Sequence, residues 1–152
     1  MLAEDLFRTR LAALVAKLED WATRYADTGS MDAKHGTGFW RVVARPATPG
    51  TCPVTLVLRA DQKFDLSLAG DLYEDRAIED FDIFPPLLEA VAQGAVERTH
   101  YACGVTGADL GHETRVLLAR GGAWGERRLR SGARITNAAV LEQRHRFLPY
   151  RR

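Results

Sequence analysis

The chain has 152 residues, of which 46% are hydrophobic and 27% are charged, and its formal net charge is +1 at pH 7. This balance is that of folded globular domains, and it argues against a disordered chain and against a membrane protein. A charge so close to zero also excludes a partner selected by global electrostatics alone. A chain of this length suits one domain with its own core, so we expect a single domain over residues 1–152.

The first predicted element is a long amphipathic helix over residues 2–27. Its apolar residues recur at three- and four-residue spacing, which is typical of one helix face. They are Leu2, Leu6, Phe7, Leu11, Leu14, Val15, Leu18, Trp21, Ala22 and Tyr25. Such a stripe would cover a sheet or pair with its copy in a dimer, and the pattern does not choose between the two.

Three strands are predicted after a polar link that contains His35. The first covers residues 39–45 and precedes the turn sequence PATPGTCP. Two alternating runs, 54–59 and 64–68, follow it. The connections are too short for a parallel crossover, so we expect an antiparallel meander with one buried face.

The stretch DLYEDRAIEDFD, residues 71–82, carries six carboxylates. Compared with a calcium loop, it places Asp71, Asp75 and Glu79 at ligand positions, but Tyr73 occupies another ligand position. Arg76 stands where such a loop needs glycine. We therefore expect a solvated acidic loop, and we propose no metal there.

The rest of the chain predicts a short helix, two or three strands and a last helix. Pro85 and Pro86 suit the first turn of the short helix, and Gly94 suits its end. Strands are expected over 96–103, 110–120 and 123–129, the last two joined by a Gly-Gly hairpin, and a final helix over 136–147. The fold class is thus α+β: an antiparallel sheet of five or six strands, packed by the long N-terminal helix and one or two shorter helices.

The segment 100–113 holds the candidate catalytic residues His100, His112 and Glu113, with Cys103 beside them. Imidazole, thiolate and carboxylate are zinc ligands and also acid-base groups. If Cys103 lies opposite Leu110, however, His100 and His112 point to opposite faces of the hairpin, and a one-residue slip would bring them together. We predict no metal and no cofactor, and we keep an enzyme as the alternative.

Other residues are candidates for contacts with a partner. They are Asp71, Glu74 and Asp75 of the acidic stretch, Trp124 beside the Gly-Gly hairpin, and Arg127, Arg128 and Arg130 of the arginine-rich end. The arginines could contact phosphates, which makes nucleic-acid binding a second alternative. Against it, the net charge is near zero and the chain carries no nucleic-acid-binding motif, so we do not expect a nucleic-acid partner.

The predicted order of helices and strands is similar to that of the chaperones that escort type III secretion effectors. This resemblance implies a dimer that holds an extended partner chain. Because no catalytic constellation is convincing and charge is segregated, we expect a non-enzymatic domain, adaptor-like or chaperone-like, that binds another protein, with its oligomeric state left open. Two cysteines and the absence of a secretory or membrane-spanning segment predict a cytoplasmic location.

Overall fold

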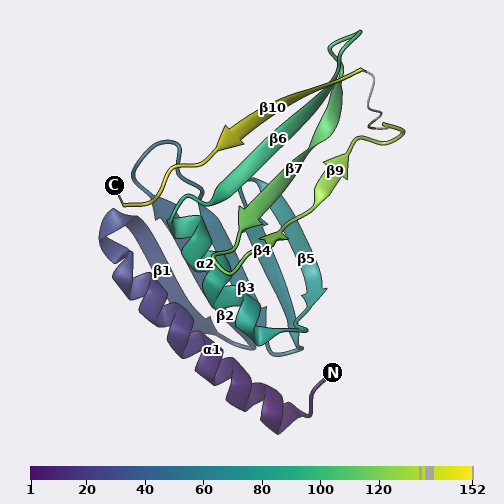
Figure 1. Cartoon of the computed structure of the whole chain (residues 1–152). Helices are drawn as coiled ribbons and strands as arrows, with labels where there is room; N and C mark the ends of the chain where they lie inside the picture. The colour runs from purple at the N-terminus through teal and green to yellow at the C-terminus, as the bar shows by residue number, and fades with distance from the viewer. Residues whose placement is uncertain (134, 136–138, 152) are drawn as a thin grey trace.

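The computed structural model of the chain describes residues 1–133, 135 and 139–151. The helices are α1 (Glu4–Arg24) and α2 (Phe84–Ala92), with single turns of 3-10 helix, η1 (Ala26–Thr28) and η2 (Phe81–Ile83). The strands are β1 (Gly29–Gly36), β2 (Phe39–Pro46), β3 (Val54–Arg59), β4 (Lys63–Leu68), β5 (Asp71–Ala77), β6 (Val96–Cys103), β7 (Asp109–Leu117), β8 (Ala123–Trp124), β9 (Arg127–Leu129) and β10 (Val140–Arg146). The predicted α+β class with antiparallel pairing is confirmed, but the strands form two sheets (Figure 1).

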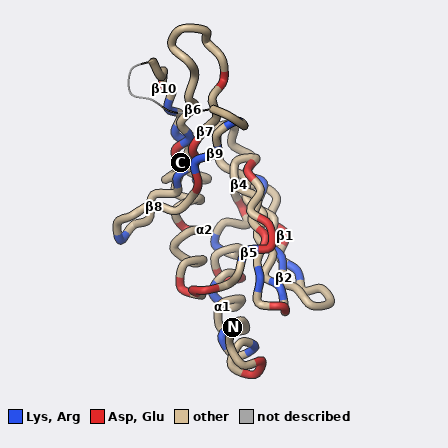
Figure 2. The backbone as a smooth tube through the Cα atoms, turned by 90° about the vertical axis from the view of Figure 1, so that its right-hand side faces the viewer, with Lys and Arg blue, Asp and Glu red and all other residues tan. Residues whose placement is uncertain are grey.

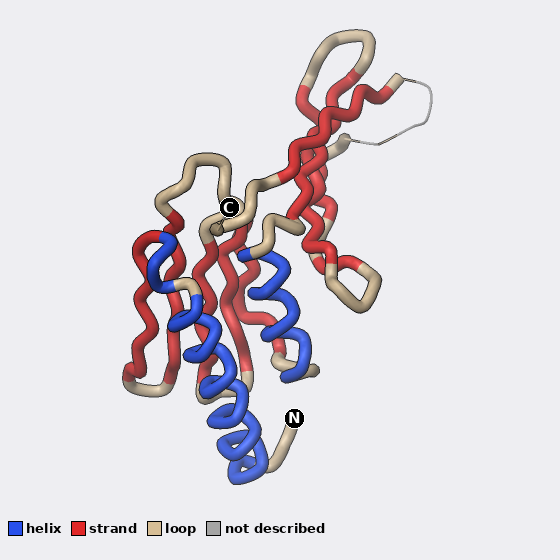
Figure 3. Tube along the Cα trace, turned by 60° about the vertical axis from the view of Figure 1, so that its left-hand side comes forward, coloured by secondary structure: helices blue, strands red, loops and turns tan. Residues whose placement is uncertain are grey.

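The first sheet is the predicted meander, extended by one strand on each side into the order β1-β2-β3-β4-β5. Its register pairs apolar residues across neighbouring strands, for example Val42 with Leu56 and Leu56 with Leu66. These side chains are buried beneath α1 and α2, which lie on the same face of the sheet (Figure 3). Burying a leucine in this way contributes about 1.5–3 kcal/mol, so this layer is the main source of stability.

The short helix α2 forms as the prolines predict and connects the two sheets. Pro85 and Pro86 lie in its first turn, where a missing N–H has no intrahelical partner to lose. Gly94 follows with φ +76°, and a Cβ there would lie 2.6 Å from the nitrogen of Pro149. Only glycine satisfies both the left-handed backbone and this close approach.

The second sheet has the order β10-β6-β7-β8, with β9 also paired to β7, and it projects from the body as an arm (Figure 1). The predicted Gly121-Gly122 hairpin joins β7 to β8, with Gly121 N–H donating to the carbonyl of Leu118 at 3.0 Å. The single strand expected over 123–129 is instead divided in two at Gly125. A Cβ at Gly125 would lie 1.9 Å from the carbonyl oxygen of Thr114, so the chain bends there at a residue that must be glycine.

Three expectations about single segments were wrong. The polar link with His35 is the strand β1, and the first seven residues of the acidic stretch form β5 and not a loop. The predicted final helix over 136–147 is the strand β10 where it is described, while residues 136–138 lie outside the described part. With two additional strands and a terminal strand in place of a helix, the chain departs from the element order on which the resemblance to secretion chaperones rested.

The C-terminal residues return to the body beside the end of α1 (Figure 1). The Tyr150 hydroxyl donates to the carbonyl of Cys52 at 2.6 Å, and its ring packs against Trp21 and Tyr25. Arg151 donates to both oxygens of Asp27. Neither described helix combines the length and the apolar character needed to span a membrane.

Candidate functional site

A buried polar cluster joins the two sheets at Asp71, the first residue of β5. The Asp71 side chain is only 5% exposed. Its carboxylate accepts hydrogen bonds from Arg98 Nη2 at 2.9 Å and from Thr114 Oγ1 at 2.8 Å, and it lies 2.7 Å from His112 Nε2. The register of β6 and β7 places Arg98 opposite Thr114, on the face that turns toward β5. One carboxylate thus gathers three side chains of the arm.

The partners of Asp71 decide its charge. Burial alone would raise the pKa of Asp71, but the hydrogen bonds from His112 and Thr114 and the positive charge of Arg98 outweigh burial and lower it. The carboxylate is therefore ionised at neutral pH and faces a guanidinium. A carboxylate whose oxygens are already bonded to several donors is suited to holding β5 against the arm, and it is poorly suited to accepting a proton from a substrate.

The structure brings two of the three candidate catalytic residues together. His100 lies directly opposite His112, with ring centroids 6.0 Å apart, so the hairpin has the one-residue slip relative to the first register considered. The register shifts at an irregularity after Tyr101, since Tyr101 lies opposite Gly111 but Ala102 lies opposite Asp109, whose side chain accepts a hydrogen bond from Gly111 N–H at 2.9 Å. The imidazole of His112 contacts the carboxylate of Asp71. Asp71 was predicted to contact a partner and was not among the candidate catalytic residues.

Glu113 lies on the opposite face of the arm from the two histidines. Its carboxylate accepts a hydrogen bond from the Tyr101 hydroxyl at 3.0 Å. Cys103 belongs to that same face, since it is two residues along β6 from Tyr101. Neither residue can orient His100 or His112, and within the described ranges no three His, Cys, Asp or Glu side chains stand close enough to hold a metal ion together.

The arginines predicted to contact a partner are each engaged within the chain. The Arg127 guanidinium stacks over Tyr101 at 5.2 Å, and Arg128 lies over Tyr73 at 4.6 Å. Arg130 forms an ion pair with Asp109 at 2.9 Å. These contacts attach β9 to its neighbours and leave fewer donors directed outward than the sequence implied.

Trp124 and Asp75 also have partners within the chain. Trp124 is half-buried, with its ring 4.7 Å from that of Tyr73, so it packs between the two sheets instead of projecting as an anchor. The Asp75 carboxylate accepts a hydrogen bond from the Arg59 guanidinium. Glu74, by contrast, is exposed and forms no ion pair with any residue in the part of the chain that the structure describes.

A shallow groove of about 420 Å³ crosses the outer face of the first sheet over β3, β4 and β5. Figure 2 shows this sheet from its side, with both helices on the other face. The apolar part of the groove includes Val57 and Leu72, and Leu72 is 55% exposed. Its charged residues are Asp65, Glu74 and Asp75 against Arg59 alone, so the groove is acidic with an apolar floor.

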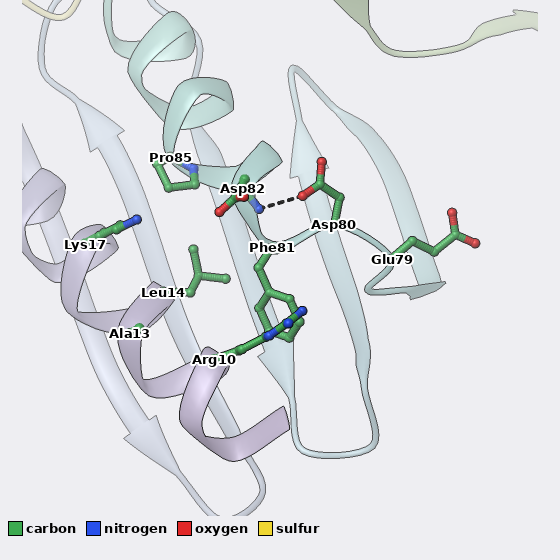
Figure 4. Close-up of a pocket in the computed structure, with 9 residues that line it drawn as sticks. All are labelled: Arg10, Ala13, Leu14, Lys17, Glu79, Asp80, Phe81, Asp82 and Pro85. Carbon is green, nitrogen blue, oxygen red and sulfur yellow. Dashed lines mark hydrogen bonds between the residues drawn. The ribbon is translucent and has the colours of Figure 1, made fainter. Parts of the chain in front are cut away.

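A second hollow of about 330 Å³ lies between α1 and the turn before α2 (Figure 4). Arg10 and Lys17 of α1 border it on one side, and Glu79, Asp80 and Asp82 border it on the other. The Asp80 side chain accepts a hydrogen bond from Asp82 N–H at 2.9 Å, which fixes the turn. Charges of both signs surround this hollow, so it favours neither an anion nor a cation.

Comparison of the chain with models of known protein families, with curated proteins and with solved structures finds no match. Two members of the Asp71 cluster, Arg98 and Thr114, were not singled out in the sequence. For Arg98, the only indication in the sequence is the alternation of side chains along a strand, which places it on the same face as the buried Val96. No local pattern in the sequence predicts the groove, because its lining residues come from three different strands.

Proposed function

We propose that this protein is a non-enzymatic, adaptor-like domain that binds another protein in the groove on the outer face of the first sheet. The observation that carries the proposal is the pairing of an apolar floor, formed by the half-buried Val57 and the exposed Leu72, with an acidic border. An apolar patch bordered by polar residues is typical of protein-binding surfaces.

The charges of the groove indicate the chemistry of the partner. Arg59 is held by three acids, with Asp61 at 2.5 Å, Asp65 at 3.5 Å and a further contact to Asp75. Its charge is therefore already neutralised inside the chain. Glu74 remains available at the border. A polypeptide segment with alternating basic and apolar side chains complements this arrangement, because its bases meet the acids while its apolar residues cover Leu72.

The experiment uses two labelled peptides, one of alternating lysine and valine and one of alternating glutamate and valine, with binding followed by fluorescence anisotropy. The basic peptide should bind, and the acidic one should not. Glu74→Lys and Leu72→Ser should each weaken binding, and added salt should weaken it further by screening. The matched control is Glu4→Lys, the same charge change at an exposed residue of α1.

The proposal fails if the basic peptide does not bind, or if Glu74→Lys binds it as well as the unmodified chain does. If Glu4→Lys weakened binding as much as Glu74→Lys does, the effect would come from the net charge of the chain, and this result would also count against the groove.

A second candidate function is acid-base catalysis by His112, favoured by the 2.7 Å contact between its Nε2 and the Asp71 carboxylate. A carboxylate in this position fixes the tautomer and orientation of an imidazole, as it does in many hydrolases. The test is hydrolysis of p-nitrophenyl acetate by His112→Gln, which keeps a donor toward Asp71, and by His100→Ala. Turnover that neither substitution lowers excludes both histidines.

A further inference from the structure

The arm ends in a strand with one unpaired edge. β10 pairs with β6 along its whole length, and no other strand among residues 1–133, 135 and 139–151 pairs with it. Six of its seven residues are exposed, including Leu141 at 61%. A free edge presents a row of backbone donors and acceptors to another strand.

The backbone hydrogen bonds show which residues of β10 face outward. Gly104 N–H donates to the carbonyl of Ala139, and Phe147 N–H donates to the carbonyl of Val96. Since backbone groups alternate in direction along a strand, the odd-numbered residues of β10 bond to β6. The even-numbered residues direct their N–H and C=O away from β6. They are Val140, Glu142, Arg144 and Arg146.

The sequence of β10 is self-complementary when two copies run antiparallel. A two-fold axis at Gln143 places Glu142 of one copy opposite Arg144 of the other, and Val140 opposite Arg146. Both are pairs of outward-facing residues, so this register forms about eight backbone hydrogen bonds in alternating pairs. A shift of the axis by one position to either side places Glu142 opposite itself or Arg144 opposite itself, and like charges directly opposite are unfavourable.

We infer that β10 pairs with β10 of a second copy of this chain, antiparallel about Gln143, so that the two arms form one continuous sheet. The two Glu142–Arg144 pairs then lie on one face and select the register. Within one chain the same side chains are already 3.7 Å apart and largely exposed. This inference uses the arm and not the groove, so it stands or fails independently of the proposed function.

The first test reverses charges and reads the mass of the particle by analytical ultracentrifugation over a range of concentrations. The unmodified chain should dimerise reversibly. Glu142→Arg and Arg144→Glu should each raise the dissociation constant at least about ten-fold, because each makes the opposed pairs alike in charge. The two single variants should associate when mixed, and the double variant with both substitutions should dimerise again.

The second test is a disulfide across the axis. Residues opposite each other in a non-hydrogen-bonded pair have Cα atoms about 4.5 Å apart, within reach of a disulfide. Gln143→Cys, in a chain with Cys103→Ser, should therefore form a covalent dimer under mild oxidation. Val140→Cys is the matched control, since six positions at about 3.3 Å each separate it from its copy by roughly 20 Å.

The inference is overturned if the unmodified chain stays monomeric at every concentration. It is also overturned if neither single charge reversal weakens the dimer, or if Gln143→Cys crosslinks no faster than Val140→Cys. A dimer formed through another edge, such as β1, would give these last two results. Circular dichroism of each variant shows that the fold is intact.

Discussion

The Asp71 carboxylate on β5 lies 2.7 Å from the His112 imidazole on β7, across 41 positions of sequence. Arg98 and Thr114 bind the same carboxylate, so donors from both central strands of the arm meet one acceptor of the first sheet. The contacts of Arg128 with Leu72 and Tyr73 lie beside this cluster and join β9 to β5. Asp71 is therefore the residue on which the polar attachment of the arm depends most.

Asp71→Asn should lower the free energy of unfolding by about 2–4 kcal/mol, because it leaves a partly buried guanidinium without its counter-charge. Urea unfolding measures this as a lower midpoint with an unchanged slope. Glu74→Gln is the matched control on the same strand, since Glu74 is exposed, and it should change stability by less than about 0.5 kcal/mol. If Asp71→Asn changed the free energy of unfolding by no more than Glu74→Gln does, the cluster would contribute little to the stability of the fold.

Stability should fall in acid through this same residue. The pKa of Asp71 is lowered from the ordinary value of 3.8 in the folded chain. A lowered pKa stabilises the folded state above the unfolded value, and this contribution is lost as the pH falls through the folded value. The difference in unfolding free energy between the unmodified chain and Asp71→Asn should therefore be constant near neutral pH and shrink below about pH 4. A difference that does not change with pH would contradict the assignment.

α1 and β3, both of which the sequence predicted, have a periodic burial pattern. In α1 the buried residues Leu14, Leu18 and Trp21 repeat at helical spacing, and β3 alternates strictly between buried and half-buried positions. β1 and β10 show no such pattern, because almost every residue in them is exposed. For them the pairing with β2 and β6 decides the conformation, and that pairing is not written in local periodicity.

The candidate site shows the same division. The sequence indicated His112 and Asp71 separately, but their meeting depends on where the arm packs against β5. The register that aligns His100 with His112 depends on the irregularity beside Gly111, whose φ is +131°. A one-residue change of register reverses every side chain of a strand, so a local backbone detail decided which candidates converge.

Tyr150→Phe should destabilise the protein by about 1–2 kcal/mol, because the carbonyl of Cys52 would remain buried without a donor. The Tyr150 ring is buried, and its hydroxyl hydrogen bond to Cys52 is 2.6 Å long. Tyr25→Phe is the matched control, since the Tyr25 hydroxyl donates to the partly exposed Glu89 and its loss should cost less. Thermal unfolding of both variants shows which substitution lowers the melting temperature more. A larger decrease for Tyr25→Phe than for Tyr150→Phe would contradict the prediction.

The two cysteines should differ in their reaction with iodoacetamide. Hydrogen bonds from the Thr106 hydroxyl and from the backbone N–H groups of Thr106 and Val105 lower the pKa of Cys103, whereas burial raises the pKa of Cys52 to about 12. The thiolate is the reactive form, so the folded chain should gain one label near neutral pH, at Cys103. Peptide mass spectrometry locates the label.

Thr106→Val should slow the labelling of Cys103 without exposing Cys52, because it removes the hydroxyl that stabilises the thiolate. Unfolding in urea provides the control, since both thiols should then react. Equal labelling of Cys52 in the folded chain would show that the core beneath Tyr150 opens readily. That result would contradict both the buried environment of Cys52 and the stabilising role of the Tyr150 hydroxyl.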